Sequence, residues 1–184
     1  MKLNKKDILT IPNLLSLLRL LMIPLFVRLY INGHEEWTAV VLLLSGMTDV
    51  ADGYIARHFH QVSEFGKAFD PLADKLTQAV MLLCLTSHHP AMLLPFCLLA
   101  GKEAVVAISG IIMIRRTGVV PGAEWHGKVA TMLLYGMMIL HVLWQDIPLW
   151  VSNTFTTVCV VMMLVSLVLY ARRNIRAIRS ASGK

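Results

Sequence analysis

Cysteine is scarce in this sequence. Its three cysteines, Cys84, Cys97 and Cys159, each stand alone in an apolar run. They lack the paired spacing of a zinc site or a disulfide framework, so we interpret them as packing residues. A long internal repeat, a low-complexity segment and a separate soluble domain are also missing. The start, MKLNKKDILTIPN, leads into an apolar stretch without a small-residue cleavage site, which argues against a removable signal peptide.

Apolar residues dominate what is present. They make up 57% of the 184 residues, and the mean hydropathy is +0.66. Both values lie outside the range of an ordinary soluble domain, so the composition predicts an integral membrane protein. The formal net charge of +6 comes from basic residues that lie mainly between and after the apolar runs. This placement fits the cytoplasmic face of a membrane with its anionic lipids, and it argues against a nucleic-acid partner.

The apolar runs predict an all-α integral membrane protein with six transmembrane helices. We expect one membrane domain over residues 1–184, in which a six-helix core over 11–170 is followed by a basic cytoplasmic tail over 171–184. A short N-terminal helix over residues 1–10 is expected to lie at the membrane interface. The six spans are predicted at about 11–31, 37–56, 65–85, 91–114, 129–144 and 148–170.

The distribution of lysine and arginine predicts the orientation of these spans. The connecting segments 32–36, 87–90 and 145–147 contain neither residue, whereas the opposite ends of the spans carry most of the basic side chains. By the positive-inside rule, both termini and the acidic ends of the second and third spans are cytoplasmic. We expect the protein to lie in a bacterial cytoplasmic membrane.

Four aspartates stand where the second and third spans meet, in the stretch DVADGYIARHFHQVSEFGKAFDPLAD. A carboxylate within a bilayer costs about 2.5 to 3.5 kcal/mol even on lenient scales, so four of them require a compensating partner. At about 100° per residue, Asp49 and Asp52 share one helix face, and Asp70 and Asp74 share a face of the next helix. Two acidic stripes can then face each other and bind hard divalent cations such as Mg2+ or Mn2+, which prefer oxygen ligands.

A structural alternative for these acids is ion pairing at the helix ends. The available partners are Arg57, Lys67 and Lys75. Pro71 lies within the second acidic stripe, where it is expected to kink the helix and to free backbone carbonyls close to the proposed metals.

The stretch resembles the signature of the CDP-alcohol phosphotransferase family, Asp-x2-Asp-Gly-x2-Ala-Arg-x8-Gly-x3-Asp-x3-Asp. Every defined position matches, and the matching residues are Asp49, Asp52, Gly53, Ala56, Arg57, Gly66, Asp70 and Asp74. Members of this family, also called CDP-alcohol phosphatidyltransferases, transfer the substituted phosphate of a CDP-linked lipid or alcohol to the hydroxyl of a second alcohol. The resemblance therefore implies release of CMP by a transferase of phospholipid synthesis.

Carried over by position, the resemblance also implies a role for each residue of the signature. Two divalent metal ions, Mg2+ or Mn2+, and a homodimer are implied. The metal ligands would be Asp49, Asp52, Asp70 and Asp74, and the CDP site would be lined by Asp52, Gly53, Ala56, Arg57 and Gly66. Asp74 would also act as the catalytic base, with the alternative that it is a metal ligand without a proton role.

The acceptor alcohol is open between two branches of the family. The run Asn-Leu-Leu-Ser-Leu-Leu-Arg resembles enzymes that make phosphatidylglycerophosphate from CDP-diacylglycerol and glycerol 3-phosphate or, in a related branch, cardiolipin from phosphatidylglycerol. Lys102 and Glu103 fall where the former enzymes carry an arginine–glutamate pair, but Gly110 stands in place of their second arginine. The acceptor phosphate requires cations, and the candidates are Arg19, Lys102, Arg115 and Lys128. His126, beside the last of these, is an alternative acceptor contact, but a lone histidine at the interface is expected to be solvated.

Two other classes of protein fit parts of the sequence. An intramembrane prenyltransferase also binds a diphosphate through aspartate-bound Mg2+, but the Gly-x2-Ala-Arg element is not part of its motifs. A divalent-cation transporter would need carboxylates near the bilayer midplane, whereas these four cluster at one end of the spans. We therefore prefer the transferase, with an active site facing the cytoplasm and glycerol 3-phosphate as the acceptor.

Overall fold

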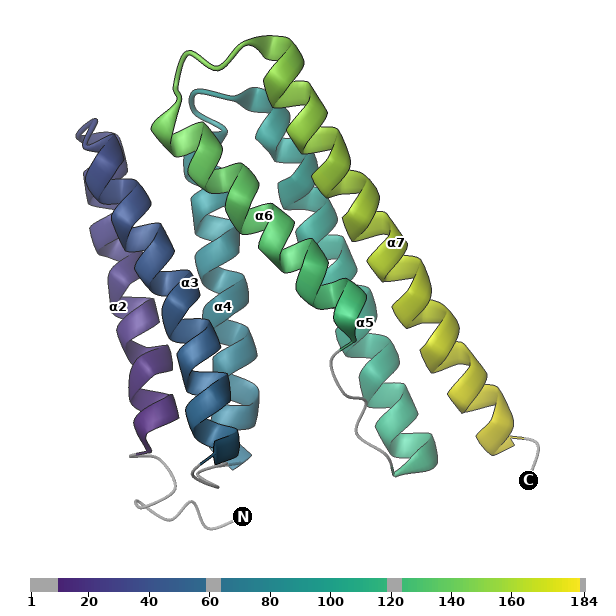
Figure 1. Ribbon diagram of the computed structural model, residues 1–184. Helices are drawn as coiled ribbons and strands as arrows, with labels where there is room; N and C mark the ends of the chain where they lie inside the picture. The colour runs from purple at the N-terminus through teal and green to yellow at the C-terminus, as the bar shows by residue number, and fades with distance from the viewer. Residues whose placement is uncertain (1–9, 59–63, 119–123, 183–184) are drawn as a thin grey trace. The chain divides into compact units, whose positions relative to one another are not determined.

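The computed structural model describes residues 10–58, 64–118 and 124–182, and within these ranges the side chains of 11, 12, 49, 50, 52–58, 64–68, 181 and 182 are outside the description. Helices joined by short connections make up the described residues, and no strand occurs among them (Figure 1). The all-α prediction is thus confirmed. The helices are α2 (Ile11–Ile31), α3 (Glu35–His58), α4 (Glu64–Leu85), the short 3-10 helix η1 (Pro90–Met92), α5 (Leu93–Thr117), α6 (Trp125–Leu143) and α7 (Leu149–Ser182).

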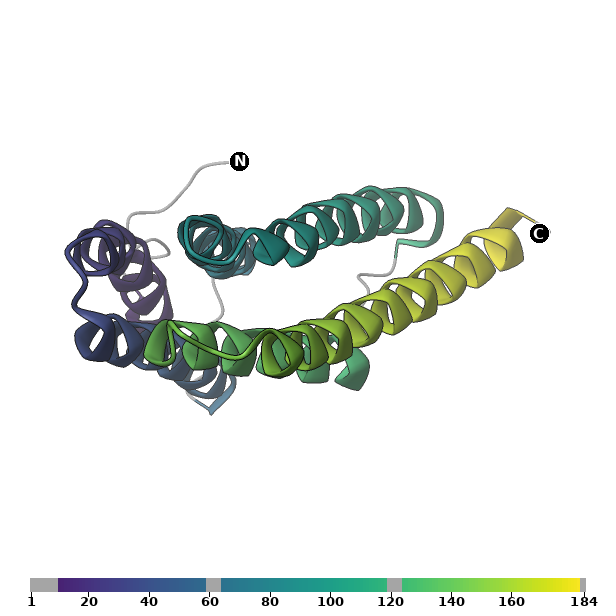
Figure 2. The ribbon, with the colours of Figure 1, turned by 90° about the horizontal axis from the view of Figure 1, so that it is seen from above.

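Helices α2, α3 and α4 form a first compact unit, which also includes residues Met138–Gln145 at and after the end of α6. α2 packs against both α3 and α4, and Figure 2 shows the three helices from above. Fully buried apolar side chains such as Phe26, Leu42 and Leu82 fill the contacts. Lipid is as apolar as these side chains, so close packing and polar contacts hold such helices together more than the hydrophobic effect does.

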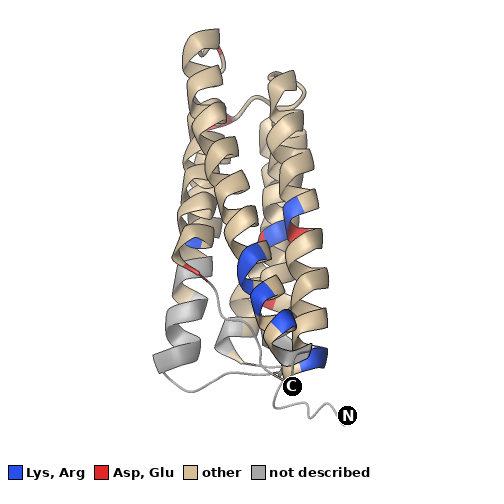
Figure 3. Cartoon of the chain, turned by 90° about the vertical axis from the view of Figure 1, so that its right-hand side faces the viewer, with Lys and Arg blue, Asp and Glu red and all other residues tan. Residues whose placement is uncertain are grey.

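The second compact unit contains η1, α5, α7 and the first part of α6, up to Met137. α5 and α7 pack against each other in this unit. α5 ends at Gly118, whose φ of +68° is a left-handed conformation that glycine adopts without steric cost. Its N–H donates to the Ile114 carbonyl at 2.8 Å. In Figure 3 most of the lysine and arginine positions, in blue, lie toward the end of the chain that is marked C.

Four helical segments of the described chain are long and apolar enough to cross a membrane, and they correspond to the first, fourth, fifth and sixth predicted spans. They are Asn13–Ile31, Pro90–Thr117, Trp125–Leu143 and Leu149–Ser180. The other two long helices, α3 and α4, carry the aspartates and further charged residues, which lower their apolar content. Long apolar helices support an integral membrane protein, and the count of six spans stays a prediction.

Tryptophan side chains lie at helix ends. Trp37 is in the first turn of α3, Trp125 begins α6, Trp144 directly follows α6, and Trp150 is in the first turn of α7. All four are exposed. Exposed tryptophans at both ends of apolar helices are typical of the aromatic belts at membrane–water interfaces.

Helix α7 extends beyond the predicted end of the last span. The sequence analysis places the end of the last span at Tyr170, followed by a basic tail, but the helix continues to Ser182. Hydropathy falls after Tyr170, whereas arginine, alanine and isoleucine still permit a helix and no proline or glycine interrupts it before Ser182. The predicted interfacial helix over 1–10 lies outside the described residues except for Thr10, the N-cap of α2.

Candidate active site

The second acidic stripe lies on α4, which runs through Pro71 from Glu64 to Leu85 without interruption. Asp70 and Asp74 are four residues apart, so they occupy one face of the helix in successive turns. Asp70 is half-buried and Asp74 is buried. The stripe therefore faces into the protein, as the spacing predicts.

Asp70 is held by the neighbouring helix α2. The Ser16 hydroxyl donates a hydrogen bond to Oδ1 of Asp70. Ser16 belongs to a stripe of polar residues at spacing three, together with Asn13 and Arg19, and all three are buried. Arg19 is fully buried although it lies within an apolar span, as expected for an arginine that faces a polar interior.

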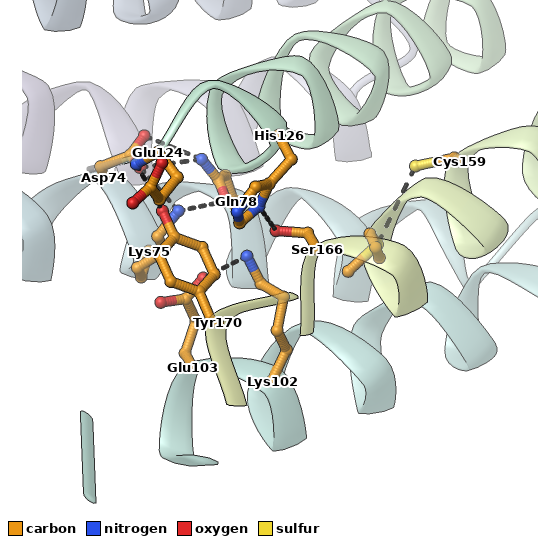
Figure 4. A network of polar contacts seen from close by, with 11 residues as sticks. Asp74, Lys75, Gln78, Lys102, Glu103, Glu124, His126, Cys159, Ser166 and Tyr170 are labelled. Atoms are coloured by element: carbon orange, nitrogen blue, oxygen red, sulfur yellow. Dashed lines mark hydrogen bonds and ion pairs between the residues drawn. The ribbon is translucent and has the colours of Figure 1, made fainter. Parts of the chain in front are cut away.

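Asp74 is held by residues of its own helix (Figure 4). The side-chain amide of Gln78, one turn further on, donates to both carboxylate oxygens at 2.9 Å. Lys75 places its Nζ 3.1 Å from Oδ2 of Asp74, and the same Nζ lies 3.4 Å from Oε1 of Gln78. The three side chains form a closed polar triad that stabilises a carboxylate in one orientation. The structural alternative of a lysine partner is therefore realised at Asp74, alongside an amide donor.

The first acidic stripe lies on α3, which is helical from Glu35 to His58. The helix carries Asp49, Asp52, Gly53, Ala56 and Arg57, and Gly66 lies near the start of α4. The side chains of these residues are outside the description. Their predicted roles as metal ligands and as the CDP site stay predictions.

The described residues supply half of the predicted metal site. Among them, no group of three or more histidine, cysteine, aspartate or glutamate side chains is close enough to hold a metal ion. Asp70 and Asp74 nevertheless present carboxylate oxygens on one inward face, each oriented by a hydrogen-bond donor. Oriented carboxylate oxygens are the ligands that Mg2+ and Mn2+ prefer, so this donor chemistry fits a hard divalent cation.

Three of the predicted acceptor-binding cations lie in the second unit, on α5 and α6. Lys102 is only 5% exposed, and its Nζ lies 2.9 Å from Oε1 of Glu103. A buried ammonium requires such a partner. Arg115, in the last turn of α5, and Lys128, in the first turns of α6, are exposed. The fourth cation, Arg19, belongs to the first unit.

The expectation of a solvated His126 is wrong. Its side chain is 5% exposed, and its Nδ1 lies 3.1 Å from Oγ of Ser166 on α7. The imidazole also meets the Tyr170 ring edge-on, with 4.6 Å between centroids. The expectation fails because Ser166 and Tyr170, on the last turns of the predicted sixth span, pack over this side chain.

The sequence analysis does not predict two polar residues that contact the aspartates, Gln78 and Ser16, as part of the site. Gln78 has a readable signal, because it follows Asp74 by four residues and so lies on the same helix face. Ser16 is visible in the sequence only as part of an α2 stripe. Its partner Asp70 is 54 residues away, and only the packing of α2 on α4 reveals the contact.

These features define a helical membrane protein with an inward acidic stripe. The chain belongs to the CDP-alcohol phosphatidyltransferase family, whose model matches residues 9–171. The predicted resemblance is confirmed.

Curated relatives fall into the two branches considered above. The chain is 32% identical, over 91% of its length and 97% of the relative, to a protein of Aquifex aeolicus named CDP-diacylglycerol–glycerol-3-phosphate 3-phosphatidyltransferase. It is 34% identical to a CMP-forming cardiolipin synthase of Streptomyces coelicolor, over 79% of its own length and 70% of the relative. A further glycerol-3-phosphate 3-phosphatidyltransferase, from Pseudomonas fluorescens, is 39% identical over 53% of this chain and 52% of the relative.

Proposed function

We propose that this protein transfers the phosphatidyl group of CDP-diacylglycerol to glycerol 3-phosphate, giving phosphatidylglycerophosphate and CMP. The observation that carries the choice of acceptor is the near full-length similarity to the Aquifex aeolicus protein of that name. Family membership supports the reaction class independently of the acceptor.

The reaction forms one bond and breaks another at the same phosphorus. A hydroxyl oxygen of the acceptor attacks the phosphatidyl phosphorus, the bond from that phosphorus to the oxygen of CMP breaks, and CMP leaves as an anion. Asp74 accepts the proton of the attacking hydroxyl. Gln78 and Lys75 keep the carboxylate of Asp74 in one orientation for this transfer.

The CDP group is assigned to the signature residues of α3 and α4. The planar guanidinium of Arg57 pairs with phosphate oxygens, and the small residues Gly53, Ala56 and Gly66 leave room for the nucleotide. Asp52 contributes to the same site. When bound at Asp49, Asp52, Asp70 and Asp74, two Mg2+ or Mn2+ ions supply the positive charge that offsets the phosphate oxygens around the attacked phosphorus.

The acceptor phosphate is assigned mainly to cations of the second unit. Lys102 is buried and its Nζ pairs with Glu103 at 2.9 Å, so an anionic acceptor phosphate has to share or replace this carboxylate partner. Lys128 provides a second charge, and Arg115 and Arg19 are further candidates.

The architecture that goes with this function has six spans, cytoplasmic termini and an acidic site that opens to the cytoplasm, in a bacterial cytoplasmic membrane and as a homodimer. Accessibility labelling tests the topology. In a variant with the native cysteines replaced by alanine, His34→Cys is expected to react with an impermeant thiol reagent from outside, and Arg176→Cys only after permeabilisation. The reverse pattern excludes this orientation.

A purified-protein assay tests the reaction. The protein is supplied with CDP-diacylglycerol, Mg2+ or Mn2+ and one acceptor at a time, and CMP release and product mass are measured. Glycerol 3-phosphate is expected to give the fastest turnover. Turnover with neither glycerol 3-phosphate nor phosphatidylglycerol excludes both acceptors.

Cardiolipin synthesis is the second candidate function. It is favoured by the similarity to the Streptomyces coelicolor protein and by Gly110, which is buried on α5 where a second arginine is expected. An enzyme of this kind uses phosphatidylglycerol and turns over glycerol 3-phosphate slowly. The same assay separates the two.

A further inference from the structure

The start of α6 is attached to α7 by one tyrosine (Figure 4). The hydroxyl oxygen of Tyr170 accepts the backbone N–H of Glu124 at 3.0 Å, and Glu124 immediately precedes α6. The Tyr170 ring also packs edge-on against His126. A Cβ atom at Gly127 would lie 2.6 Å from the same hydroxyl oxygen, so the close approach of the two helices depends on glycine at that position.

Arg173 completes the attachment about one turn further along α7. Its Nη1 lies 2.7 Å from Oε1 of Glu124, and its guanidinium carbon lies 5.0 Å from the centroid of the Tyr170 ring. Glu124 is therefore held twice, at its main chain by Tyr170 and at its side chain by Arg173. The side chains of this ion pair are 28% and 38% exposed, so the pair by itself adds little to stability.

The same part of α7 is fixed to α5. Asn174 is 1% exposed, and its side-chain amide donates to Oγ of Ser109 at 2.7 Å. Nε of Arg173 donates to the side-chain oxygen of Asn174 at 3.3 Å. Arg173 is thus oriented by a buried residue that is itself anchored on a second helix. The side chain of α7 that holds Glu124 is therefore itself fixed by hydrogen bonds that lead to α5.

We propose that Tyr170 and Arg173 are positioning residues that hold the start of α6 in the geometry needed to bind the acceptor alcohol. Together with Glu124 they form what we call the α7 clamp. Lys128 follows Glu124 by four residues and lies in the first turns of α6. The inference rests on the proposed function, in which Lys128 contacts the acceptor phosphate.

The clamp and the CDP site belong to different units. The residues assigned to CDP binding lie on α3 and α4 in the first unit, whereas the clamp joins α6 and α7 in the second. Loosening the clamp therefore displaces an acceptor contact and leaves the CDP contacts in place. A displacement of about 1 Å in a bound group can cost up to about a hundredfold in rate. A purely structural staple would instead weaken the use of both substrates together.

Steady-state kinetics of the full-length protein in lipid nanodiscs test the inference. The variants are Arg173→Gln and Tyr170→Phe, with Arg173→Lys as the conservative rescue. Arg172→Gln is the matched control, because it removes the same charge from an exposed neighbour on the same helix. Arg173→Gln is expected to raise the acceptor KM about tenfold while the KM for CDP-diacylglycerol changes less than about twofold. Arg173→Lys restores part of the loss, and Arg172→Gln has no effect.

Hydrogen exchange gives a readout that does not depend on turnover. Amide exchange over residues 124–128 is expected to speed up about tenfold in Arg173→Gln and Tyr170→Phe but not in Arg172→Gln. Unchanged amide exchange in Arg173→Gln and Tyr170→Phe, or an equal rise in the KM values of both substrates, overturns the proposed role of the clamp. If Lys128→Gln raises the acceptor KM and Arg173→Gln does not, the proposed acceptor site stands and the clamp is excluded. If Arg173→Gln raises the acceptor KM and Lys128→Gln does not, the proposal for the clamp stands, and Lys128 is not the residue that contacts the acceptor.

Discussion

Asp74 in the first unit and Arg173 in the second are held in different ways. In the first, Asp74 is held by Lys75 and Gln78, which belong to its own helix and lie within one turn. In the second, Arg173 pairs with Glu124, which lies 49 residues earlier in the sequence, directly before α6. A substitution in the local arrangement alters one carboxylate and leaves the helix packing in place. A substitution in the long-range arrangement releases a helix end, so the two arrangements are expected to fail in different ways.

The largest effect is expected from removing a carboxylate of the first unit. Asp70→Ala deletes a predicted metal ligand together with the acceptor of the Ser16 hydroxyl, so turnover should fall below detection. Metal-dependent thermal stabilisation should be lost as well. CMP release and melting with and without Mg2+ measure the two effects. Asp146→Asn, an exposed acid outside the site, is the control, and substantial turnover in Asp70→Ala would remove Asp70 from the metal site.

A smaller loss is expected when Asp74 keeps its shape but loses its charge. Asp74→Asn can no longer accept a proton, so turnover should fall by about 10²- to 10⁴-fold, while binding of CDP-diacylglycerol is retained. Single-turnover kinetics and equilibrium binding of the CDP-lipid separate these effects. Near-normal turnover leaves Asp74 as a metal ligand without a proton role.

Substitutions of the buried or exposed lysines of the second unit are expected to weaken binding of the acceptor. Lys102→Gln or Lys128→Gln removes a charge-assisted contact of about 1.5 to 3 kcal/mol, so the acceptor KM should rise by roughly ten- to a hundredfold. Binding of CDP-diacylglycerol should change little. Arg176→Gln is the control, because it removes an exposed charge from the same unit. Equal losses for both substrates would place these lysines in the fold or the nucleotide site instead.

The smallest effect is expected from the amide that orients Asp74. Gln78→Leu removes the amide nitrogen that donates to both oxygens of the carboxylate, so the apparent affinity for Mn2+ should fall by about tenfold. Electron paramagnetic resonance of free Mn2+ reports this without turnover. Thr77→Val is the matched control, because Thr77 is equally buried but donates to the Ala73 carbonyl. Identical Mn2+ affinities in the two variants would reduce Gln78 to a packing residue.

The sequence predicts most of the helices because long apolar runs are a strong signal. The bounds 11–31 and 65–85 agree with α2 and α4 to within one residue. Helix α7 runs beyond the predicted end of the last span, because a drop in hydropathy marks where a span ends and not where a helix ends. Helix spacing also accounts for the inward stripe of Asp70 and Asp74.

Contacts between distant helices are what the sequence does not reveal. Arg173 is one of several basic residues after the last apolar run, and nothing in its immediate neighbours points to Glu124. The same holds for Ser16 and Asp70. Such pairs depend on which helices pack together, and helical periodicity describes one helix at a time.

Helix α7 has 34 residues and is therefore about 51 Å long at 1.5 Å per residue. Its apolar part, from Leu149 to Tyr170, rises about 33 Å, close to the roughly 30 Å of a bilayer's hydrocarbon layer. Trp150 lies near one end of this part, and the arginines begin just after the other. Both ends favour the interface, so a membrane-spanning α7 is expected to tilt in a thinner bilayer. A change in bilayer thickness is therefore expected to change the tilt of the helix that carries Arg173.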